Sequence, residues 1–498
     1  MSSKMNRRTF LGSAMATSVF TIVPRHVLGG AGHVAPSEKL NLAHIGMGTQ
    51  GFNELGTLLN DPQIQITAVC DPNTDSSNYV EWGKHGVRNR IRSYMDKSTW
   101  REGESGCPGG REVGREVVDT YYKNHLGVNQ FKGCAAYADF RELLANETDL
   151  DAVKIMTPDH LHATISIAAM KKGHHVLMHK PIANRMYEGR QVLKTQAQTN
   201  RATHLLAYGS GAGNRLIAKR IKEGVIGPLR EVHNWSNRPV WPQYTEKPVD
   251  KPAVPKGFDW DLWLGPVTHR PYHPHYTHTV FRGWYDFGGG SMADMGIYSL
   301  WPVFSELNLD TPVSAEAWAS HACTIKDNVS RPIWNDFSYP AACSIRLHFA
   351  ARNTTPALDL FWYDGGMKPR LPREVEAHDI RMGKEGILFV GDQGAILADF
   401  HGQNPRLFTQ GKNKPLDLTQ DNPSRPHPLQ LWIQACKGGK GSPGSFLNAR
   451  AITDAVNLGT VALRTGKKVL FDSKEMKITN VSDANKYLVR EYRPGWEL

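Results

Sequence analysis

A glycine-rich turn near the start of the chain limits its possible folds more than any other feature. The segment Leu40–Ile45 alternates like a strand and ends in Gly46-Met47-Gly48-Thr49-Gln50-Gly51, and apolar residues then recur at helical spacing from Phe52 to Leu59. A second strand, Ile64–Cys70, ends in Asp71, twenty residues after Gly51. A strand, glycine turn, helix and acid at this spacing form the βαβ unit that binds dinucleotides.

The turn is predicted to hold the pyrophosphate of the dinucleotide. Gly46 makes the tight turn, Gly48 lets the backbone approach the phosphates, and Gly51 allows close packing of helix on strand. The helix N-terminus then faces the phosphate charge. The predicted cofactor contacts in this segment are Gly46, Met47, Gly48, Gln50 and Gly51.

Asp71 indicates which dinucleotide is bound. Its carboxylate would accept hydrogen bonds from the ribose 2′-hydroxyl and repel a 2′-phosphate. The next residues, Pro72-Asn73-Thr74, include no arginine that could pair with a 2′-phosphate. The sequence therefore favours NAD over NADP.

The doubly wound pattern resumes after segment 79–134, which is long for a Rossmann crossover and is interpreted as an insertion of unassigned role. Strand Leu150–Met156 ends in Thr157-Pro158-Asp159-His160-Leu161-His162, and strand Val176–Met178 ends in His179-Lys180-Pro181. In such sheets ligands bind beyond the carboxyl ends of the strands. We therefore expect these residues beside the nicotinamide: Thr157, Pro158, His160, His162, His179 and Lys180.

From residue 208 the pattern changes to alternating strands, such as Glu231–Trp235 and Ser344–Phe349, separated by long loops. This predicts an α+β domain on a mainly antiparallel sheet, following an N-terminal α/β Rossmann domain with a doubly wound parallel sheet. The predicted organisation is a leader at 1–35, an NAD-binding domain at 36–207 and a substrate-binding domain at 208–498.

Segment 269–287 is dense in aromatic residues, histidines and arginines, which are side chains that bind sugars. Aromatic faces stack on sugar C–H surfaces, and His and Arg hydrogen-bond to hydroxyls. The predicted substrate contacts are His275, Tyr276, Arg282 and Trp284. Four histidines lie within ten residues, but no carboxylate or cysteine completes a metal shell, so we predict no metal. A solvated surface loop remains the alternative.

At this point the sequence resembles the glucose–fructose oxidoreductase / inositol dehydrogenase (Gfo/Idh/MocA) family over essentially everything after the leader. The resemblance is carried by several motifs besides the glycine turn: Thr157–His162, Lys180-Pro181, Trp260–Pro266, Gly288–Tyr298, Val461–Gly466 and Glu491–Trp496. It implies an NAD-dependent oxidoreductase that transfers a hydride at a hydroxyl of a sugar or glycoside.

Two departures from the family pattern affect the catalytic residues. Where the family has Glu-Lys-Pro, with its lysine between nicotinamide ribose and substrate, this chain has His179-Lys180-Pro181. Where the family has Asp followed four residues later by His, this chain has Asp294 and Tyr298, which resembles the branch with glucose–fructose oxidoreductase and dihydrodiol dehydrogenase, where tyrosine is the acid/base.

The predicted catalytic residues are Lys180, Asp294 and Tyr298. A phenol of ordinary pKa is a poor base at neutral pH, so we expect the Lys180 ammonium to stabilise the Tyr298 phenolate, and Asp294 to orient the substrate or the tyrosine. Two structural alternatives remain open: Lys180-Pro181 simply ends a strand, and Tyr298 packs as a core aromatic.

The N-terminal segment resembles a twin-arginine export signal. Arg7-Arg8-Thr9-Phe10-Leu11 precedes an apolar stretch of about 15 residues, which is too short to span a bilayer. Such signals address folded proteins for export, which implies a periplasmic or otherwise exported protein. Because nicotinamide cofactors are scarce outside the cell, we expect NAD to be tightly bound and recycled in place.

The net charge of +11 does not indicate a nucleic-acid partner, because the leader supplies four positive charges and the remainder mixes both signs. The six cysteines form no Cys-x-x-Cys pair and are expected to be free thiols, a Cys107–Cys134 disulfide being the alternative. The expected partners are a small carbohydrate substrate and further copies of the chain in a homo-oligomer, with no nucleic acid and no stable membrane insertion.

Two other functions remain compatible with the sequence. Some relatives in the family are NAD-dependent glycosidases, which oxidise C3 transiently, eliminate the aglycone, add water and reduce again. A non-catalytic sugar-binding protein that kept the fold is the other alternative.

Overall fold

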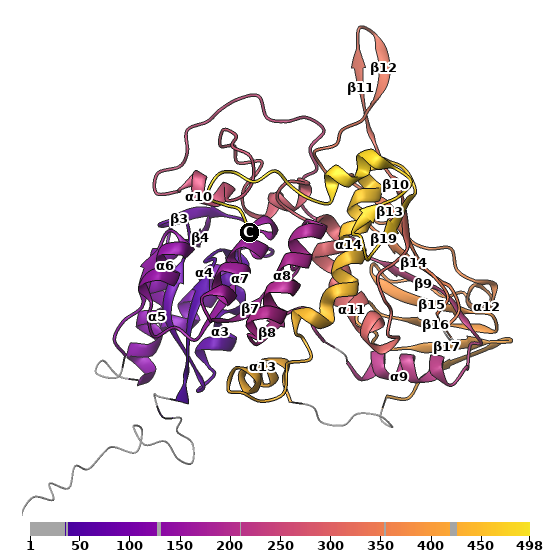
Figure 1. The fold of residues 1–498 in the computed structure, drawn as a ribbon, viewed down its shortest axis with the longest axis horizontal. Helices are drawn as coiled ribbons and strands as arrows, with labels where there is room; N and C mark the ends of the chain where they lie inside the picture. Colours follow the sequence, from indigo (N-terminus) through magenta and orange to yellow (C-terminus); the bar gives the residue numbers. More distant parts are fainter. Residues whose placement is uncertain (1–34, 36–37, 127–130, 210, 353–354, 419–425) are drawn as a thin grey trace, which may run out of the picture.

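The computed structural model describes residues 35, 38–126, 131–209, 211–352, 355–418 and 426–498, and these are organised around two large sheets (Figure 1). Except for Ala35, the predicted leader lies outside the described residues.

The N-terminal sheet is parallel and six-stranded, in the order β5-β2-β1-β6-β7-β8. Its strands are β1 (Leu40–Ile45), β2 (Ile64–Cys70), β5 (Ala135–Tyr137), β6 (Ala152–Ile155), β7 (His175–Met178) and β8 (Thr203–Leu205). The strand order reverses between β1 and β6, which is where an open α/β sheet binds its ligand. The predicted Rossmann sheet is confirmed.

Helices cover both faces of this sheet: α3 (Thr49–Leu59), α5 (Arg111–Leu126), α6 (Phe140–Asn146), α7 (His162–Lys171) and α8 (Met186–Thr199). The expected insertion contains a small antiparallel pair, β3 (Ser76–Tyr79) with β4 (Cys107–Gly109), and helix α4 (Gly86–Met95). Helix α5, which follows β4, packs on β2 and belongs to the regular crossover.

The second sheet has ten strands in the order β18-β17-β16-β15-β9-β14-β13-β10-β19-β20. Its strand pairs are antiparallel apart from β9 with β14. The bounds are β9 (Leu229–Trp235), β10 (Ser314–Ala319), β13 (Cys343–Phe349), β14 (Leu358–Tyr363), β15 (Gly386–Gly391), β16 (Gly394–Ala398), β17 (Arg406–Thr409), β18 (Lys412–Pro415), β19 (Val469–Asp472) and β20 (Lys477–Ile478). The predicted α+β domain on a mainly antiparallel sheet is confirmed.

Helices α11 (Ile297–Glu306) and α14 (Arg450–Thr465) lie between this sheet and the Rossmann domain, and α9 (Ala212–Lys222) packs against α11 (Figure 1). Helix α14 packs on β10 and β13 and also contacts α8 of the first domain. One buried apolar cluster therefore includes Ile45 and Val153 of the first sheet together with Trp301 and Leu347 of the second domain. The two domains share a continuous core.

Two segments of the C-terminal domain lie apart from its ten-stranded sheet. Helix α13 (Pro428–Cys436) packs Leu429, Trp432 and Ile433 into the core of the Rossmann domain, so the chain returns to the first domain late in its sequence. The hairpin of β11 (Ala322–Lys326) and β12 (Val329–Ile333) projects from the molecule (Figure 1).

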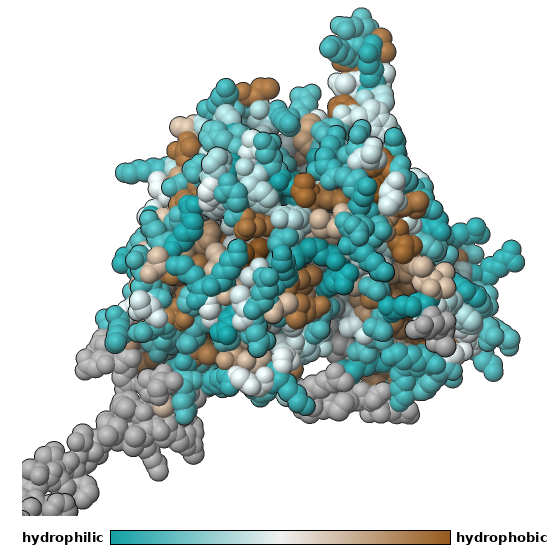
Figure 2. All heavy atoms as spheres, viewed as in Figure 1, coloured by the Kyte–Doolittle hydropathy of each residue, from teal (hydrophilic) through white to brown (hydrophobic). Residues whose placement is uncertain are grey.

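The molecular face in Figure 2 is mostly hydrophilic, with apolar residues in separate small patches, some of them on that hairpin. Within the described ranges, no helix has the length and hydropathy needed to cross a membrane. All six cysteines are free thiols, as expected, and Cys107 and Cys134 are both buried.

Candidate active site

The glycine turn connects the end of β1 to the start of α3, and its shape requires glycine. Gly46 has a φ of +101°, and a Cβ at this residue would lie 2.6 Å from the carbonyl group of Met156. A Cβ at Gly51 would lie 2.3 Å from the Gly46 carbonyl oxygen. Both clashes are with backbone atoms, which have no room to move. The loop thus keeps bare backbone at the helix N-terminus, where a pyrophosphate can approach.

Asp71 follows β2 and forms hydrogen bonds both with the glycine turn and with Tyr79 of the cavity wall. Its carboxylate accepts hydrogen bonds from the backbone N–H of Met47 and of Asn73, both at 2.8 Å, and from the Tyr79 hydroxyl at 3.2 Å. Burial raises the pKa of Asp71 to about 6, although these donors act in the opposite direction. The group is therefore ionised at neutral pH and has acceptor capacity left for a ribose hydroxyl.

A cavity of about 280 Å³ opens between the two domains at the carboxyl ends of the parallel strands. Many of the predicted site residues line it: Gly46, Gly48, Gln50, Gly51, Asp71, Thr157, Pro158, His179, Lys180, Arg282, Asp294 and Tyr298. Other lining residues were not predicted: Thr49, Pro72, Tyr79, Trp82, Met156, Leu161, Arg238, Phe258, Trp263, His278, Thr279, Phe281 and Met295. Tyr79 and Trp82 belong to the expected insertion, so this segment forms part of the cavity wall.

Asp294 brings three cations together at the substrate end of the cavity. Its carboxylate accepts a 2.6 Å hydrogen bond from Lys180 Nζ and lies 3.1 Å from Arg282 Nε and 3.7 Å from Arg238 Nε. Burial would raise its pKa, but the three cations hold it well below its usual range. Burial lowers the pKa of Lys180, Asp294 opposes this shift, and Arg282 adds to it.

The Tyr298 hydroxyl has a different partner from the one we expected. It lies 2.8 Å from His179 Nε2, whereas Lys180 Nζ lies 5.1 Å from the centre of the tyrosine ring and donates to Asp294. Burial raises the pKa of Tyr298, and Glu54 and Asp294 raise it further. The expected stabilisation of a Tyr298 phenolate by Lys180 is therefore wrong for this structure, because Asp294 takes up the lysine charge.

A carboxylate that the sequence analysis missed lies behind His179. Glu54 of α3 has Oε1 3.4 Å from His179 Nε2 and Oε2 3.2 Å from Lys154 Nζ, and it accepts a 3.0 Å hydrogen bond from Gln50. Burial lowers the pKa of His179 to about 3. Despite its burial, Glu54 has its pKa lowered to about 2 by its neighbours His179 and Lys154. Because the imidazole is neutral at pH 7, we assign the ionisation of Glu54 mainly to Lys154.

The signal for Glu54 was present in the sequence. Glu54 follows Gln50 by four residues and therefore lies on the same face of the predicted helix, beside the cofactor turn. This chain has histidine where the family motif has glutamate, and Glu54 supplies a carboxylate to the same neighbourhood from another element.

Three predicted cofactor contacts lie behind the cavity wall. The ring nitrogens of His160 lie 2.8 Å from the Trp263 carbonyl oxygen and 3.3 Å from that of Phe287. Those of His162 lie 2.6 Å from the Pro181 carbonyl oxygen and 2.9 Å from that of Thr157. Met47 is fully buried and contributes its backbone N–H to Asp71. None of the three side chains lines the cavity, so we correct their role to positioning.

Three of the four predicted sugar contacts also lie away from the cavity lining. Tyr276 and Trp284 are buried in an aromatic cluster with Trp263, and the Trp284 indole N–H donates to the His275 carbonyl at 2.7 Å. The His275 ring stacks on Tyr244 with centroids 4.4 Å apart. The rings of Tyr276 and Trp284 are packed against other rings and are not available to stack on a sugar. In this segment, the residues that do line the cavity are His278, Thr279, Phe281 and Arg282.

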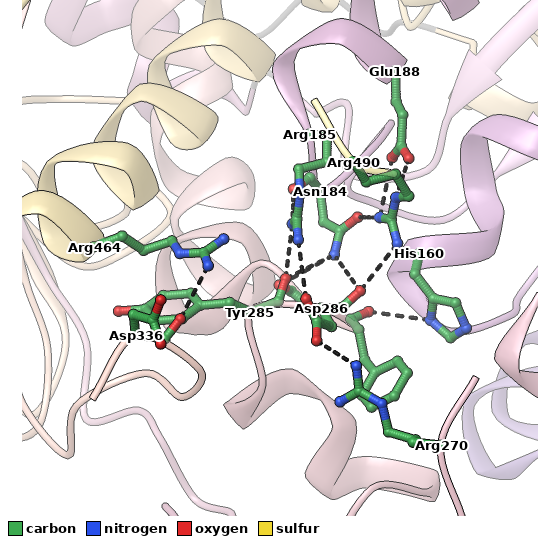
Figure 3. A network of polar contacts seen from close by, with 12 residues as sticks. His160, Asn184, Arg185, Glu188, Arg270, Tyr285, Asp286, Asp336, Arg464 and Arg490 are labelled. Carbon is green, nitrogen blue, oxygen red and sulfur yellow. Dashed lines mark hydrogen bonds and ion pairs between the residues drawn. The ribbon is translucent and has the colours of Figure 1, made fainter. Parts of the chain in front are cut away.

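A polar network attaches this loop to the Rossmann domain (Figure 3). Asp286 pairs with Arg185 at 3.4 Å and with Arg270 at 2.6 Å, and Arg185 also donates to the Tyr285 carbonyl at 2.8 Å. Arg490, near the C-terminus, contacts Glu188 and Asn184. Within this network, Asn184 follows Lys180 by four residues and Asp286 precedes Asp294 by eight, so the network holds the segments that carry Lys180 and Asp294 relative to each other.

Three histidines of segment 269–287 contact other side chains of the protein. His273 Nε2 lies 3.2 Å from Asp250, the His275 ring stacks on Tyr244, and the His278 ring contacts the Tyr79 ring at a tilt, with centroids 4.2 Å apart. Over the described part of the chain, no group of three or more His, Cys, Asp or Glu side chains is arranged to hold a metal ion.

A glycine turn of this kind, facing a lysine, an aspartate and a tyrosine across one cavity, defines a two-domain oxidoreductase with an NAD-binding domain. The chain belongs to the Gfo/Idh/MocA oxidoreductase family. Residues 40–206 match the family's NAD-binding Rossmann fold, and residues 214–359 match its C-terminal alpha/beta domain.

Individual relatives are more distant. A levoglucosan dehydrogenase of Pseudarthrobacter phenanthrenivorans is 32% identical over 112 residues, which are 21% of this chain and 28% of that protein. An alpha-N-acetylgalactosaminidase of Shewanella oneidensis is 22% identical over 220 residues, which are 43% of this chain and 39% of that protein. The matches thus span well under half the length of these relatives.

Among solved structures, the WlbA dehydrogenase of Bordetella pertussis, in complex with NADH and UDP-GlcNAcA, has a similar fold. The TM-score is 0.52 at 13% identity, and the match covers 87% of this chain and 99% of that one. At this identity the likeness concerns the fold alone.

Proposed function

We propose that the protein is an NAD-dependent oxidoreductase that transfers a hydride at a hydroxyl-bearing carbon of a sugar or glycoside. The observation that carries the proposal is the meeting of two hydrogen-bonded pairs, Lys180 with Asp294 and Tyr298 with His179, in the cavity that begins at the glycine turn. Both pairs lie beyond the carboxyl ends of the parallel strands, where such sheets bind their ligands, and this supports the proposal.

The residues at the nucleotide end fit NAD. The glycine turn leaves space that a Cβ would fill, and Asp71 presents a carboxylate to the cavity at the end of β2. Arg111 is the nearby cation, but it donates to the backbone carbonyls of Asp71 and Pro72 and does not line the cavity. This arrangement supports NAD over NADP. When bound, NAD would accept the hydride from the sugar carbon and return it in the reverse direction.

The proton of the substrate hydroxyl would leave through Tyr298. A buried phenol with a raised pKa does not persist as a phenolate, so Tyr298 takes the substrate proton while it passes its own proton to neutral His179. The bond from substrate oxygen to hydrogen breaks, and a new N–H bond forms at His179 Nε2. This requires the His179 tautomer that carries its proton on Nδ1. The carboxylate of Glu54, 3.4 Å away, stabilises the imidazolium that results.

Lys180 and Asp294 would position the reacting carbon. Asp294 holds Lys180 Nζ at 2.6 Å on the cavity wall, where the amine can donate to the substrate oxygen as negative charge develops. Such preorganised donors act strongly in a site shielded from water.

Steady-state kinetics with NAD and a panel of sugars test the proposal. Wild-type protein should form reduced cofactor with at least one sugar, and Tyr298→Phe should lower kcat by about a hundredfold or more because it removes the proton path. A protein that binds NAD and a sugar but forms neither reduced cofactor nor altered sugar would contradict the assignment.

We further propose that the protein is exported through its twin-arginine leader with NAD already bound. The supporting observation is the Arg7-Arg8 pair ahead of an apolar segment. Replacement of both arginines by lysine should leave the protein in the cytoplasm, whereas unchanged export would contradict the signal.

A second candidate function is NAD-dependent glycoside hydrolysis. The match to an alpha-N-acetylgalactosaminidase over 43% of this chain favours it. Release of an aglycone without net formation of reduced cofactor would identify it, whereas reduced cofactor in proportion to product would identify the oxidoreductase.

A further inference from the structure

The substrate end of the cavity carries more positive charge than its carboxylate can balance. Lys180, Arg238 and Arg282 surround the single carboxylate of Asp294, and all four side chains line the cavity. The other acid that lines the cavity, Asp71, faces the glycine turn through its bond to Met47. These four side chains therefore leave a surplus of two positive charges.

The histidines of the cavity do not change this balance. Burial lowers the pKa of His179 to about 3 and that of His278 to about 4, so both rings are neutral at pH 7. The surplus thus comes from the two arginines.

Among the described residues, the buried Nε–H of Arg238 has no hydrogen-bond acceptor. Its Nε is buried without a hydrogen-bond partner among the described residues, and the 3.7 Å separation from Asp294 is too long for a hydrogen bond. Its guanidinium lies 5.8 Å from the ring centre of Trp82 at the cavity wall. A buried guanidinium donor without an acceptor is unfavourable, and a carboxylate ligand would supply the acceptor.

Neighbouring residues fix the backbones of both arginines at the cavity wall. The Arg238 N–H donates to Ser236 Oγ at 3.3 Å, and its carbonyl accepts from the Gly365 N–H at 2.5 Å. The Arg282 backbone packs so closely on Gly288 that a Cβ there would lie 2.6 Å from the Arg282 Cα. Arg282 also stacks on Phe281, with its guanidinium carbon 4.5 Å from the ring centre.

We propose that the substrate is an acidic sugar of monosaccharide size, a uronate or aldonate, whose carboxylate binds Arg238 and Arg282 while its reacting hydroxyl faces Tyr298. This inference rests on the proposed function, because it names the substrate class of the same site. A guanidinium fork matches the two oxygens of a carboxylate. The small cavity, about 280 Å³ in all, must also admit the nicotinamide, which favours a compact acid.

The test uses the full chain with saturating NAD and matched sugar pairs: glucose with glucuronate, galactose with galacturonate, and glucose with a glucose phosphate. Two quantities are measured for each sugar: kcat/KM from reduced cofactor, and affinity by calorimetry, which does not require turnover. The uronate should exceed its neutral partner by about tenfold to about a hundredfold in both quantities.

Arg238→Gln should abolish most of this preference by raising the KM for the acid, with the affinity for NAD unchanged. Arg238→Lys should restore part of it, because it keeps the charge but not the fork. The matched control is Arg230→Gln on β9, the strand that precedes Arg238, because the Arg230 guanidinium pairs with Asp392 at the surface. This control should behave as wild type.

The outcomes separate this inference from the proposed function. Turnover with equal or better use of the neutral sugar or the phosphate would overturn the acidic-sugar inference and leave the oxidoreductase. Selective binding of the uronate without reduced cofactor would support the inference and overturn the oxidoreductase. If no sugar binds, or if Arg238→Gln weakens NAD and leaves the sugar preference intact, the inference is overturned.

Discussion

His179 is the residue on which the proposed proton path depends. Burial disfavours the Tyr298 phenolate, and the Lys180 ammonium is paired with Asp294, so the tyrosine proton needs another acceptor. The neutral imidazole of His179, 2.8 Å from the tyrosine hydroxyl, gives that proton a destination. In the proposed mechanism, the histidine that departs from the family motif is therefore the partner of Tyr298 in proton transfer.

His179→Gln should therefore lower kcat by about a hundredfold, with little change in the KM for sugar, because a general base contributes about that much. Glu54→Gln should lower kcat less, by about tenfold, since it removes only the charge that stabilises the imidazolium.

The pH profile of kcat at saturating NAD should show no acidic limb near the ordinary histidine pKa, because burial lowers the pKa of His179 to about 3. An acidic limb near pH 6.5 in kcat would contradict the assignment of His179 as a buried neutral base.

Asp71 should make NAD binding pH-dependent. Its pKa is raised to about 6 by burial, so the carboxylate that accepts the ribose hydroxyl is present above that pH and lost as the pH falls through it. Affinity for NAD, measured by calorimetry, should be about tenfold weaker at about pH 5 than at about pH 8. Asp71→Asn should bind weakly at both values. An NAD affinity that is independent of pH in wild type would contradict this role.

At the scale of elements, Arg490 of the C-terminal segment links the two domains through its contacts with Glu188 and Asp286, and we call these three residues the clamp. Arg490 forms a buried ion pair with Glu188 at the start of α8, and it also donates to the Asp286 carbonyl at 3.3 Å (Figure 3). Because the clamp holds the loop before Asp294, its loss should affect both stability and catalysis.

Glu188→Gln should lower the free energy of unfolding by about 3 kcal/mol or more, since it leaves the Arg490 charge buried without its partner. Urea titration followed by tryptophan fluorescence measures the change. Glu223→Gln is the control, because its pair with Arg220 lies at the surface, where such pairs contribute little. If both variants unfold at the same urea concentration, the clamp does not contribute to stability.

Strands and helices that show a regular pattern of apolar residues along the chain were predictable from the sequence. The strands Leu40–Ile45 and Ile64–Cys70 have the predicted bounds, because each is an apolar run bounded by a turn or an acid. The four-residue spacing of Asp294 and Tyr298 predicted one helical face. In the structure a π-helical turn, Met292–Gly296, precedes α11, so Asp294 reaches Lys180 while Tyr298 reaches His179.

Contacts between distant elements were not predictable. Arg238 follows β9 of the second domain, and only the packing of the two domains brings it to the cavity beside Lys180. The aromatic residues of 269–287 indicated a sugar pocket by composition, but composition does not say which rings face a cavity. Tyr276 and Trp284 are buried against other rings because that removes more apolar surface from water.

At the scale of the whole molecule, the shared core makes the cavity a fixed space between the domains. Residues of both sheets belong to one buried apolar cluster, and α13 packs back onto the Rossmann domain. We expect such a body to retain its cofactor. Protein purified without added nucleotide and then denatured should release about one NAD per chain, identified by mass spectrometry. Recovery of fully active protein that contains no nucleotide would contradict retention.

The most direct test of the central claim is a single-turnover experiment on the NAD-loaded protein. Mixed with a reactive sugar, the wild-type protein should develop the absorbance band of reduced nicotinamide at a rate that Tyr298→Phe and His179→Gln both slow, with oxidised sugar formed in equal amount. If sugar binds beside NAD and no reduced nicotinamide forms, even transiently, then the cavity is a binding site and the account of hydride transfer at Tyr298 is wrong.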